Sequence, residues 1–158
     1  MKVIKRDVPI SMADVFDRAT RSRVMAAIRG GNTKPELIVR RFLHSHGFRF
    51  RIHHRRLPGS PDLVLNRWRT VIFVHGCFWH QHSNCRFAGL PQSNPEFWQV
   101  KLKGNQRRDA RNIKRLRRLG WRVLTVWECS VAMRDLERLQ RRIQSPLSPA
   151  QCRLRGSR

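Results

Sequence analysis

The segment HGCFWHQHSNC, from His75 to Cys85, constrains the fold more than any other part of the sequence. It contains three of the seven histidines and two of the four cysteines of the chain, and a further cysteine, Cys129, lies far downstream. A tetrahedral metal site uses four nitrogen or sulfur ligands. The segment alone offers five such side chains, so we expect four ligands to gather here and at least one histidine to serve another task.

The cysteine spacing predicts a structural zinc site. Cys77 and Cys85 supply two thiolates, and Cys129, which follows the predicted strand RVLTVWE, can supply a third. Spacing leaves the fourth ligand open between His80 and His82, since both lie between the two nearby cysteines. Three thiolates and one imidazole leave no open coordination position, which is typical of structural zinc. The alternative is free cysteines that lie near histidines by chance, and their clustering favours metal.

The net charge points to a polyanionic partner. The chain has 34 Lys and Arg against 10 Asp and Glu, a formal net charge of +24, and most of the basic residues are arginine. Because a planar guanidinium binds two phosphate oxygens at once, this composition favours a nucleic-acid ligand. No run approaches the roughly 18 apolar residues of a membrane helix, and MKVIKRDVPI lacks the apolar region of a secretory signal. We expect a cytoplasmic protein without membrane contact, and Cys152 as a free thiol.

Apolar periodicity and chain breakers predict one α/β domain. Thr33, Pro35 and Glu36 form the pattern of a helix start with a capping box, and Gly47 ends that helix. The expected elements, in the order α-α-β-β-β-α-β-α, are helix 18–28, helix 33–46, strands 48–52, 62–65 and 71–74, helix 94–120, strand 122–127 and helix 131–143. The apolar face of the last helix comprises Met133, Leu136, Leu139 and Ile143. We assign 17–144 to the domain, 1–16 to a loose N-terminal arm and 145–158 to a basic, disordered tail.

A second site is predicted where two strands end. Pairing strands 62–65 and 71–74 as a hairpin, with Leu65 opposite Val71, sets Asp62 opposite Val74. The histidines of the cysteine segment then lie over the same edge. One carboxylate, one or two imidazoles and a backbone carbonyl can hold Mg²⁺, which beside a basic surface favours phosphodiester hydrolysis. The residues alone also allow ordinary roles, because Asp after Pro is often a turn residue and Glu36 can serve only as a cap.

Five strings of the sequence match one family in its own order. They are MADVFDRATRSRVMAAIR, LPGSPDLVL, VIFVHGCFWHQH, NPEFWQVKLKGNQRRD and LGWRVLTVWEC. From about Met12 to Leu139 the chain resembles the very short patch repair (Vsr-type) endonucleases of bacteria. The resemblance implies a restriction-endonuclease-like α/β fold, with a central mixed sheet flanked by helices. It also implies Mg²⁺-dependent nicking of one strand of double-stranded DNA beside a T·G mismatch, which arises when 5-methylcytosine is deaminated.

The resemblance implies a role for each candidate residue by position. Asp62 would be the Mg²⁺ carboxylate, with the Val74 carbonyl as a further ligand. His80 would be the catalytic histidine, with His75 and Glu36 in support. The implied zinc ligands are Cys77, His82, Cys85 and Cys129. The implied DNA contacts are Met25, Phe78 and Trp79, which would wedge into the base stack, and Trp98, which would pack against the DNA.

The expected protein is therefore a monomeric mismatch endonuclease of the cytoplasm, associated with the nucleoid and open to other repair proteins as partners. The main alternative is a zinc-stabilised nucleic-acid-binding protein without catalysis. It accounts for the charge and the zinc ligands, but it leaves Asp62, His75 and His80 without a task. A third reading, a basic ribosome-associated protein, predicts that Asp62→Ala is tolerated.

Overall fold

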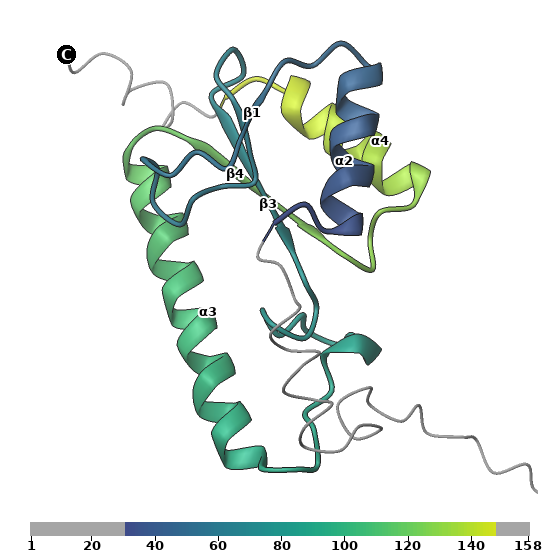
Figure 1. Ribbon diagram of the computed structural model, residues 1–158. Coiled ribbons are helices and arrows are strands. Elements are labelled where there is room, and N and C mark those ends of the chain that lie inside the picture. Colours follow the sequence, from purple (N-terminus) through teal and green to yellow (C-terminus); the bar gives the residue numbers. More distant parts are fainter. Residues whose placement is uncertain (1–30, 148–158) are drawn as a thin grey trace, which may run out of the picture.

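The computed structural model describes residues 31–147 of the chain (Figure 1). Its elements are α2 (Lys34–Ser45), β1 (Arg51–Ile52), β2 (Leu63–Leu65), β3 (Thr70–His75), the 3-10 turn η1 (Arg86–Ala88), α3 (Pro95–Arg118), β4 (Arg122–Trp127) and α4 (Met133–Gln144). From the second predicted helix onward, the predicted order of helices and strands is confirmed. The first predicted helix, Met25, Cys152, the N-terminal arm and most of the tail lie outside the described residues.

The four strands form one mixed sheet in the order β1-β2-β3-β4. β2 pairs antiparallel with β1 and with β3, whereas β3 and β4 run parallel, with His75 beside Trp127. The predicted α/β class with a mixed sheet is thus confirmed. Only Arg51–Ile52 of the predicted strand 48–52 is paired in the sheet.

The predicted register of the hairpin was wrong by one residue. Leu65 pairs with Thr70 rather than Val71. The reason is the tight connection, in which Trp68 N donates to Leu65 O (3.1 Å) and Arg69 has a φ of 47°. A loop of four residues closes there, so Thr70 joins the strand and every later partner shifts by one.

Two apolar layers cover the two faces of the sheet. Figure 1 shows α2 and α4 together on one side of the sheet and α3 on the other. The alternation within β2 follows these layers, since Leu63 and Leu65 pack with α2 and α4 while Val64 packs with Leu116 of α3. Burial on both faces explains why β2 and β3 read as continuous apolar runs.

The last helix differs from its predicted face at one position. Leu136, Leu139 and Ile143 are buried, but Met133, the first residue of the helix, is 64% exposed. At its other end, Arg122 of β4 donates to four carbonyl oxygens of residues 142–146 and so satisfies the open end of α4. None of the helices that the structure describes is long and apolar enough to cross a membrane.

Candidate active site and metal cluster

Three groups of potential metal ligands lie near the end of β3, among the described residues. They are Cys77, His82, Cys85 and Cys129; His75, His80 and Asp109; and Glu36, His53 and Asp62. Within each group the ligand atoms lie within 4.8 Å of one another. The eleven-residue segment that the sequence singled out therefore contributes to two different groups.

The cysteine group joins the loop after β3 to the end of β4. Parallel pairing of the two strands brings Cys129 to this loop, and Glu128 accepts a hydrogen bond from the Cys77 backbone N–H (2.8 Å). His82 Nδ1 lies 3.6 Å from the Cys77 sulfur and 3.3 Å from the Cys129 sulfur. His82, rather than His80, is therefore the imidazole among the thiols.

The donor set of this group fits zinc. Burial raises the pKa of the Cys77 thiol to about 12, so a cation is needed to hold this sulfur as a thiolate. The His82 ring stacks on Trp127 with centroids 4.2 Å apart, which fixes its orientation. Three sulfurs and one imidazole nitrogen make up the closed set that is typical of structural zinc.

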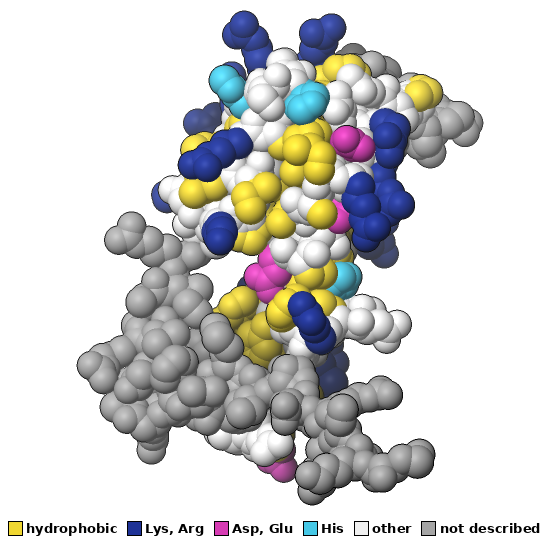
Figure 2. Space-filling model, turned by 90° about the vertical axis from the view of Figure 1, so that its right-hand side faces the viewer, with side chains coloured by type: hydrophobic (Ala, Val, Ile, Leu, Met, Phe, Trp, Pro, Cys, Tyr) yellow, Lys and Arg dark blue, Asp and Glu magenta, His cyan; other side chains and the backbone are white. Residues whose placement is uncertain are grey.

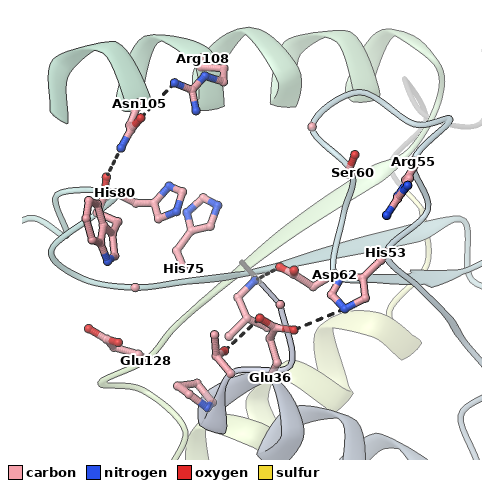
Figure 3. Close-up of a pocket in the computed structure, with 17 residues that line it drawn as sticks. Glu36, His53, Arg55, Ser60, Asp62, His75, His80, Asn105, Arg108 and Glu128 are labelled. Atoms are coloured by element: carbon pink, nitrogen blue, oxygen red, sulfur yellow. Dashed lines mark hydrogen bonds and ion pairs between the residues drawn. The ribbon is translucent and has the colours of Figure 1, made fainter. Parts of the chain in front are cut away.

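A cavity of about 1060 Å³ opens beside this group, over the edge of the sheet (Figure 3). Asn105 and Arg108 of α3 form one wall, and Arg55 and Ser60 of the β1–β2 connection form another. That connection touches α3 directly, since a Cβ at Gly59 would come within 2.9 Å of an α3 side chain. The two basic side chains on opposite walls can meet a phosphate backbone, although three carboxylates, those of Glu36, Asp62 and Glu128, also line the cavity.

His80 is held by a carboxylate that the sequence analysis did not identify as functional. Its Nδ1 lies 2.6 Å from Asp109 Oδ2, and its ring stacks on His75 with centroids 3.8 Å apart and planes 7° apart. An ionised carboxylate only accepts, so Nδ1 carries a hydrogen, and in the neutral form of the ring the lone pair is on Nε2. Burial, and then the charge of His80, lower the pKa of His75 to about 4, so His75 is neutral near pH 7.

A pattern in α3 could have identified Asp109. The residues of this helix that face the sheet are apolar at its ends, where Trp98, Leu102 and Leu116 are buried. Between them, on the same face, lie the partly buried Asn105 and Asp109. Polar side chains in the middle of an otherwise apolar stripe are a signal of a site beneath the helix.

Asp62 lies at the cavity floor, one residue before β2. Its Oδ2 accepts the Val74 backbone N–H at 2.7 Å, in spite of the shifted register. Burial raises the pKa of the Asp62 carboxyl, and the hydrogen bond from Val74 opposes that shift. The nearby charge of Glu36 raises the pKa further. Oxygen ligands of this kind suit a hard cation such as Mg²⁺.

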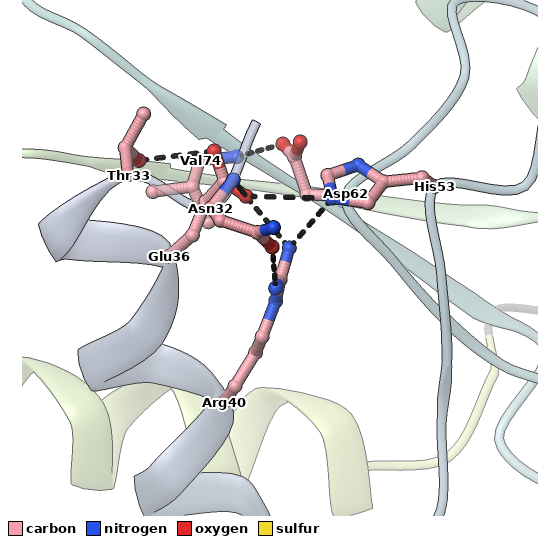
Figure 4. Close-up of polar contacts among 7 residues, drawn as sticks. All are labelled: Asn32, Thr33, Glu36, Arg40, His53, Asp62 and Val74. Carbon is pink, nitrogen blue, oxygen red and sulfur yellow. Dashed lines mark hydrogen bonds and ion pairs between the residues drawn. The ribbon is translucent and has the colours of Figure 1, made fainter. Parts of the chain in front are cut away.

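Glu36 does not form the predicted capping box. The Thr33 hydroxyl donates to the Glu36 carboxylate (2.9 Å) and accepts no capping hydrogen bond from a helix N–H, while the Asn32 N–H donates to the other oxygen of Glu36 (3.0 Å). Two residues that the sequence patterns did not predict, Arg40 and His53, also join this group (Figure 4). The only signal in the sequence was the spacing of four residues between Glu36 and Arg40.

The predicted DNA-contacting aromatics form one cluster. Phe78 and Trp79 are partly buried, and both meet Trp98 edge to face, with centroids 5.3 and 6.1 Å apart. Trp98 is only 6% exposed, so it lies beneath the other two rings. Asn105 donates to the Trp79 carbonyl (3.1 Å), which fixes the loop against α3. Their roles toward DNA stay predictions.

The chain is similar to known proteins along most of its length. The family model described as DNA mismatch endonuclease Vsr matches residues 13–86. The chain is 44% identical over 139 residues to the type II nicking enzyme V.XorIIP of Xanthomonas oryzae pv. oryzae, covering 88% of this chain and 100% of that protein. It is 48% identical over 124 residues to the DNA mismatch endonuclease Vsr of Escherichia coli, covering 78% of this chain and 79% of that protein.

Proposed function

Since the chain belongs to the Vsr family of DNA mismatch endonucleases, it nicks DNA at mismatches during repair, and we propose that its substrate is the T·G mismatch left by deamination of 5-methylcytosine. We further propose a Mg²⁺-dependent reaction, in very short patch repair, by a monomer with a restriction-endonuclease-like fold. It would act in the cytoplasm at the nucleoid, alongside other repair proteins. The observation that carries this proposal is one cavity lined by both the Asp62 carboxylate and the imidazole of His80, which Asp109 holds through Nδ1.

The proton-transfer chemistry follows from the geometry of His80. With its Nδ1–H donated to Asp109, His80 has Nε2 available to accept the proton of the attacking water. The imidazolium that results is stabilised by the Asp109 carboxylate at 2.6 Å. The neutral ring of His75 stacks on His80 and fixes its plane without adding a competing charge. The water attacks phosphorus, and the bond to one bridging oxygen breaks to leave a nick.

Asp62 and the Val74 carbonyl are the residues that would hold Mg²⁺. The ion supplies charge stabilisation to the phosphoryl oxygens of the substrate. Asp62 has one oxygen engaged by the Val74 N–H and a second oxygen that accepts no hydrogen bond from the described residues, which fits a metal ligand. The four ligands of the cysteine group would hold structural Zn²⁺ and so anchor the loop that bears His80.

DNA binding is assigned to the basic residues of α3, the helix that contributes Asn105 and Arg108 to the cavity wall (Figure 3). They are Lys101, Lys103, Arg107, Arg108, Arg111, Lys114, Arg115, Arg117 and Arg118. Positive charge is not confined to this helix, because Figure 2, which views the side of α2 and α4, also shows lysine and arginine side chains. Arg108 of α3 lines the cavity together with Asp62 and His80, so we place the duplex along α3.

Mismatch preference is assigned to Phe78 and Trp79, with Met25 as a further wedge. Apolar side chains that enter a base stack cost about a few kcal/mol per unstacked step, and a mismatch has less stacking to lose. Trp98 supports both rings from below. Lys101 lies 5.6 Å from the Trp79 ring centre, where it can meet the backbone beside an inserted ring.

The test is nicking of a duplex with one T·G mismatch beside its matched C·G control, with Mg²⁺ and without it. We expect one strand to be cut beside the mismatch only with Mg²⁺, and Trp79→Ala to retain Mg²⁺-dependent cutting but lose the preference. Equal cutting of both duplexes would contradict the T·G assignment. Tight binding without cutting would support the zinc-stabilised, non-catalytic alternative.

A further inference from the structure

The connection between β1 and β2 forms the end of the cavity that lies opposite His80. Figure 3 shows Arg55 and Ser60 of this connection at one end, His80 at the other, and Asp62 between them. Arg55 and Arg108 are the two arginines among the described residues that line the cavity, and no described lysine lines it. Arg108 lies on the side of His80. The end formed by the β1–β2 connection therefore has a cation of its own.

The side chains of Arg55 and Ser60 are exposed, and no described residue engages them. No described carboxylate lies within 4.0 Å of the Arg55 guanidinium, and neither side chain makes a hydrogen bond to another described residue. The same cavity is lined by three carboxylates, those of Glu36, Asp62 and Glu128. A phosphate that enters this end is repelled by these carboxylates, and the unpaired guanidinium of Arg55 offsets that repulsion.

A tight turn braces this connection against α3. The Ser60 backbone N–H donates to the Leu57 carbonyl (3.0 Å), which closes the turn. Pro58 and Gly59 form its centre, and Gly59 has a φ of 76°, as the third position of such a turn requires. A Cβ at Gly59 would come within 2.9 Å of the Asn112 side chain of α3. This close approach fixes the connection, and with it Ser60, at the edge of the cavity.

Ser60 has a backbone conformation that serine seldom adopts. Its φ is 48°, in the left-handed region that favours glycine, and the fully buried Pro61 follows it. Glycine at this position would relieve the strain, so the hydroxyl is present at a cost to the stability of the fold. Strained residues of this kind cluster at ligand-binding sites. Since the Ser60 side chain bonds no described residue, we look for its partner in the substrate.

We propose that Arg55 and Ser60 bind the DNA phosphate that lies beyond the nick, on the side away from the mismatch. A guanidinium and a hydroxyl are both common donors to phosphate oxygens. The mismatch belongs at the His80 end, because Trp79, the proposed wedge, directly precedes His80 and lines the cavity with it. A strand that passes from there over Asp62 reaches Arg55 next. This inference rests on the proposed function, since it takes the mismatch to lie beside Trp79.

The first test is the salt dependence of duplex binding by the zinc-loaded protein without Mg²⁺. Arg55→Ala should lower the slope of log K against log salt by about 0.9, the contribution of one neutralised phosphate. Arg56→Ala is the matched control, because Arg56 is also exposed and follows Arg55 in the chain but does not line the cavity. It should leave the slope unchanged. An unchanged slope for Arg55→Ala, or equal changes in the two variants, would overturn the proposal.

The second test locates the phosphate. Each duplex of a series with one T·G mismatch carries a single uncharged methylphosphonate, placed at successive positions of each strand. Neutralising the contacted phosphate should weaken binding by the unaltered protein but have no further effect on Arg55→Ala. This position should lie farther from the mismatch than the position that is silent in Arg108→Ala. The reverse order, or no position at which Arg55→Ala differs from the unaltered protein, would contradict the proposed placement.

Two replacements of Ser60 separate its contact with DNA from its effect on the fold. Ser60→Ala removes the hydroxyl alone, whereas Ser60→Gly removes the hydroxyl and also relieves the strained backbone. We expect both variants to bind the T·G duplex several-fold more weakly, while Ser60→Gly has a Tm at least as high as that of the unaltered protein. A folded Ser60→Gly with unaltered affinity would show that the hydroxyl contacts no phosphate.

These outcomes separate the inference from the proposed function. All the measurements are of binding or thermal unfolding, so a failure to nick T·G DNA would leave them unchanged. Equal affinity for the T·G and matched duplexes would count against the proposed mismatch preference, and the salt slope of Arg55→Ala would still decide whether Arg55 contacts a phosphate. A clear T·G preference together with an unchanged slope for Arg55→Ala would overturn the inference alone.

Discussion

The cysteine group and the catalytic cavity share the loop after β3, which contributes residues to both. They differ in how their potential metal ligands are arranged. The four side chains of the cysteine group converge on one point within 4.8 Å. Around the cavity, Asp62, His80 and Glu36 come from different elements and leave open space of about 1060 Å³ between them. A closed set of ligands fits a structural task, whereas separated groups around open space leave room for a substrate.

The largest effect, on folding, is expected when one of the four side chains of the cysteine group is removed. Cys129→Ala removes the ligand that ties β4 to the loop, and structural zinc can contribute about 10–16 kcal/mol to the folding of small domains. We expect loss of zinc and a low yield of folded protein. Zinc content and thermal unfolding measure this, and a folded, active, metal-free variant would show that the cysteine group has no structural role.

Replacing His82 and His80 by alanine, one at a time, tests whether the first belongs to the cysteine group and the second to the catalytic cavity. His82→Ala should lose zinc and fold. His80→Ala should keep zinc, fold and DNA binding but lose nicking by about 100- to 10,000-fold, since that is the range of general base contributions. If His80→Ala lost zinc while His82→Ala kept it, the two assignments would be reversed.

A smaller effect is expected from the carboxylate behind His80. Asp109→Asn retains the size of the side chain but removes the charge that orients His80 and stabilises its protonated form. Outer-shell carboxylates on histidines are worth about 10- to 100-fold at metal sites, and we expect a loss of that size in the nicking rate. The measurement is the single-turnover rate on the T·G duplex, and Arg134→Ala, an exposed position on α4, is the comparison. A loss as large as that of His80→Ala would contradict a supporting role.

The burial of Asp62 predicts an effect on stability rather than on rate. Because the pKa of Asp62 is raised in the folded protein, the charged form costs stability at neutral pH, and that cost disappears as pH falls through the raised pKa. Asp62→Asn should therefore have a higher Tm than the unaltered protein near pH 8 without added Mg²⁺, with a difference that shrinks toward acid pH. A variant that is less stable at every pH would contradict this, and would indicate that its bond to Val74 dominates.

The smallest effect is expected in the salt dependence of DNA binding, and it distinguishes the face with α3 from the face with α4. Arg108 lines the cavity, so Arg108→Ala should lower the slope of log K for duplex binding against log salt by about 0.9 if it contacts one phosphate. Arg134→Ala, an exposed position on α4, should leave the slope unchanged. Equal changes from both variants would mean that DNA contacts both faces.

The sequence by itself determined the order of elements and identified the three cysteines that lie together in the structure. Helix starts, breakers and apolar periodicity depend on neighbouring residues, so they predicted β4 at its observed bounds, Arg122–Trp127, and α2 within one residue of its observed bounds. Asp62 and the histidines of the loop were also identified, because they lie beside strand ends. The one-residue error between β2 and β3 shows the limit of such patterns, since the length of a turn decides the register.

Only the tertiary structure decided which side chains meet. Spacing left His80 and His82 equivalent as ligands, and parallel pairing of β3 and β4 brings Cys129 to His82, while α3 carries Asp109 to His80. The meeting of Arg40 with His53 likewise depends on how α2 packs against the β1–β2 connection. The physical reason is that each of these pairs joins elements distant in the chain, whose approach is fixed by the burial of two apolar layers and not by any local pattern.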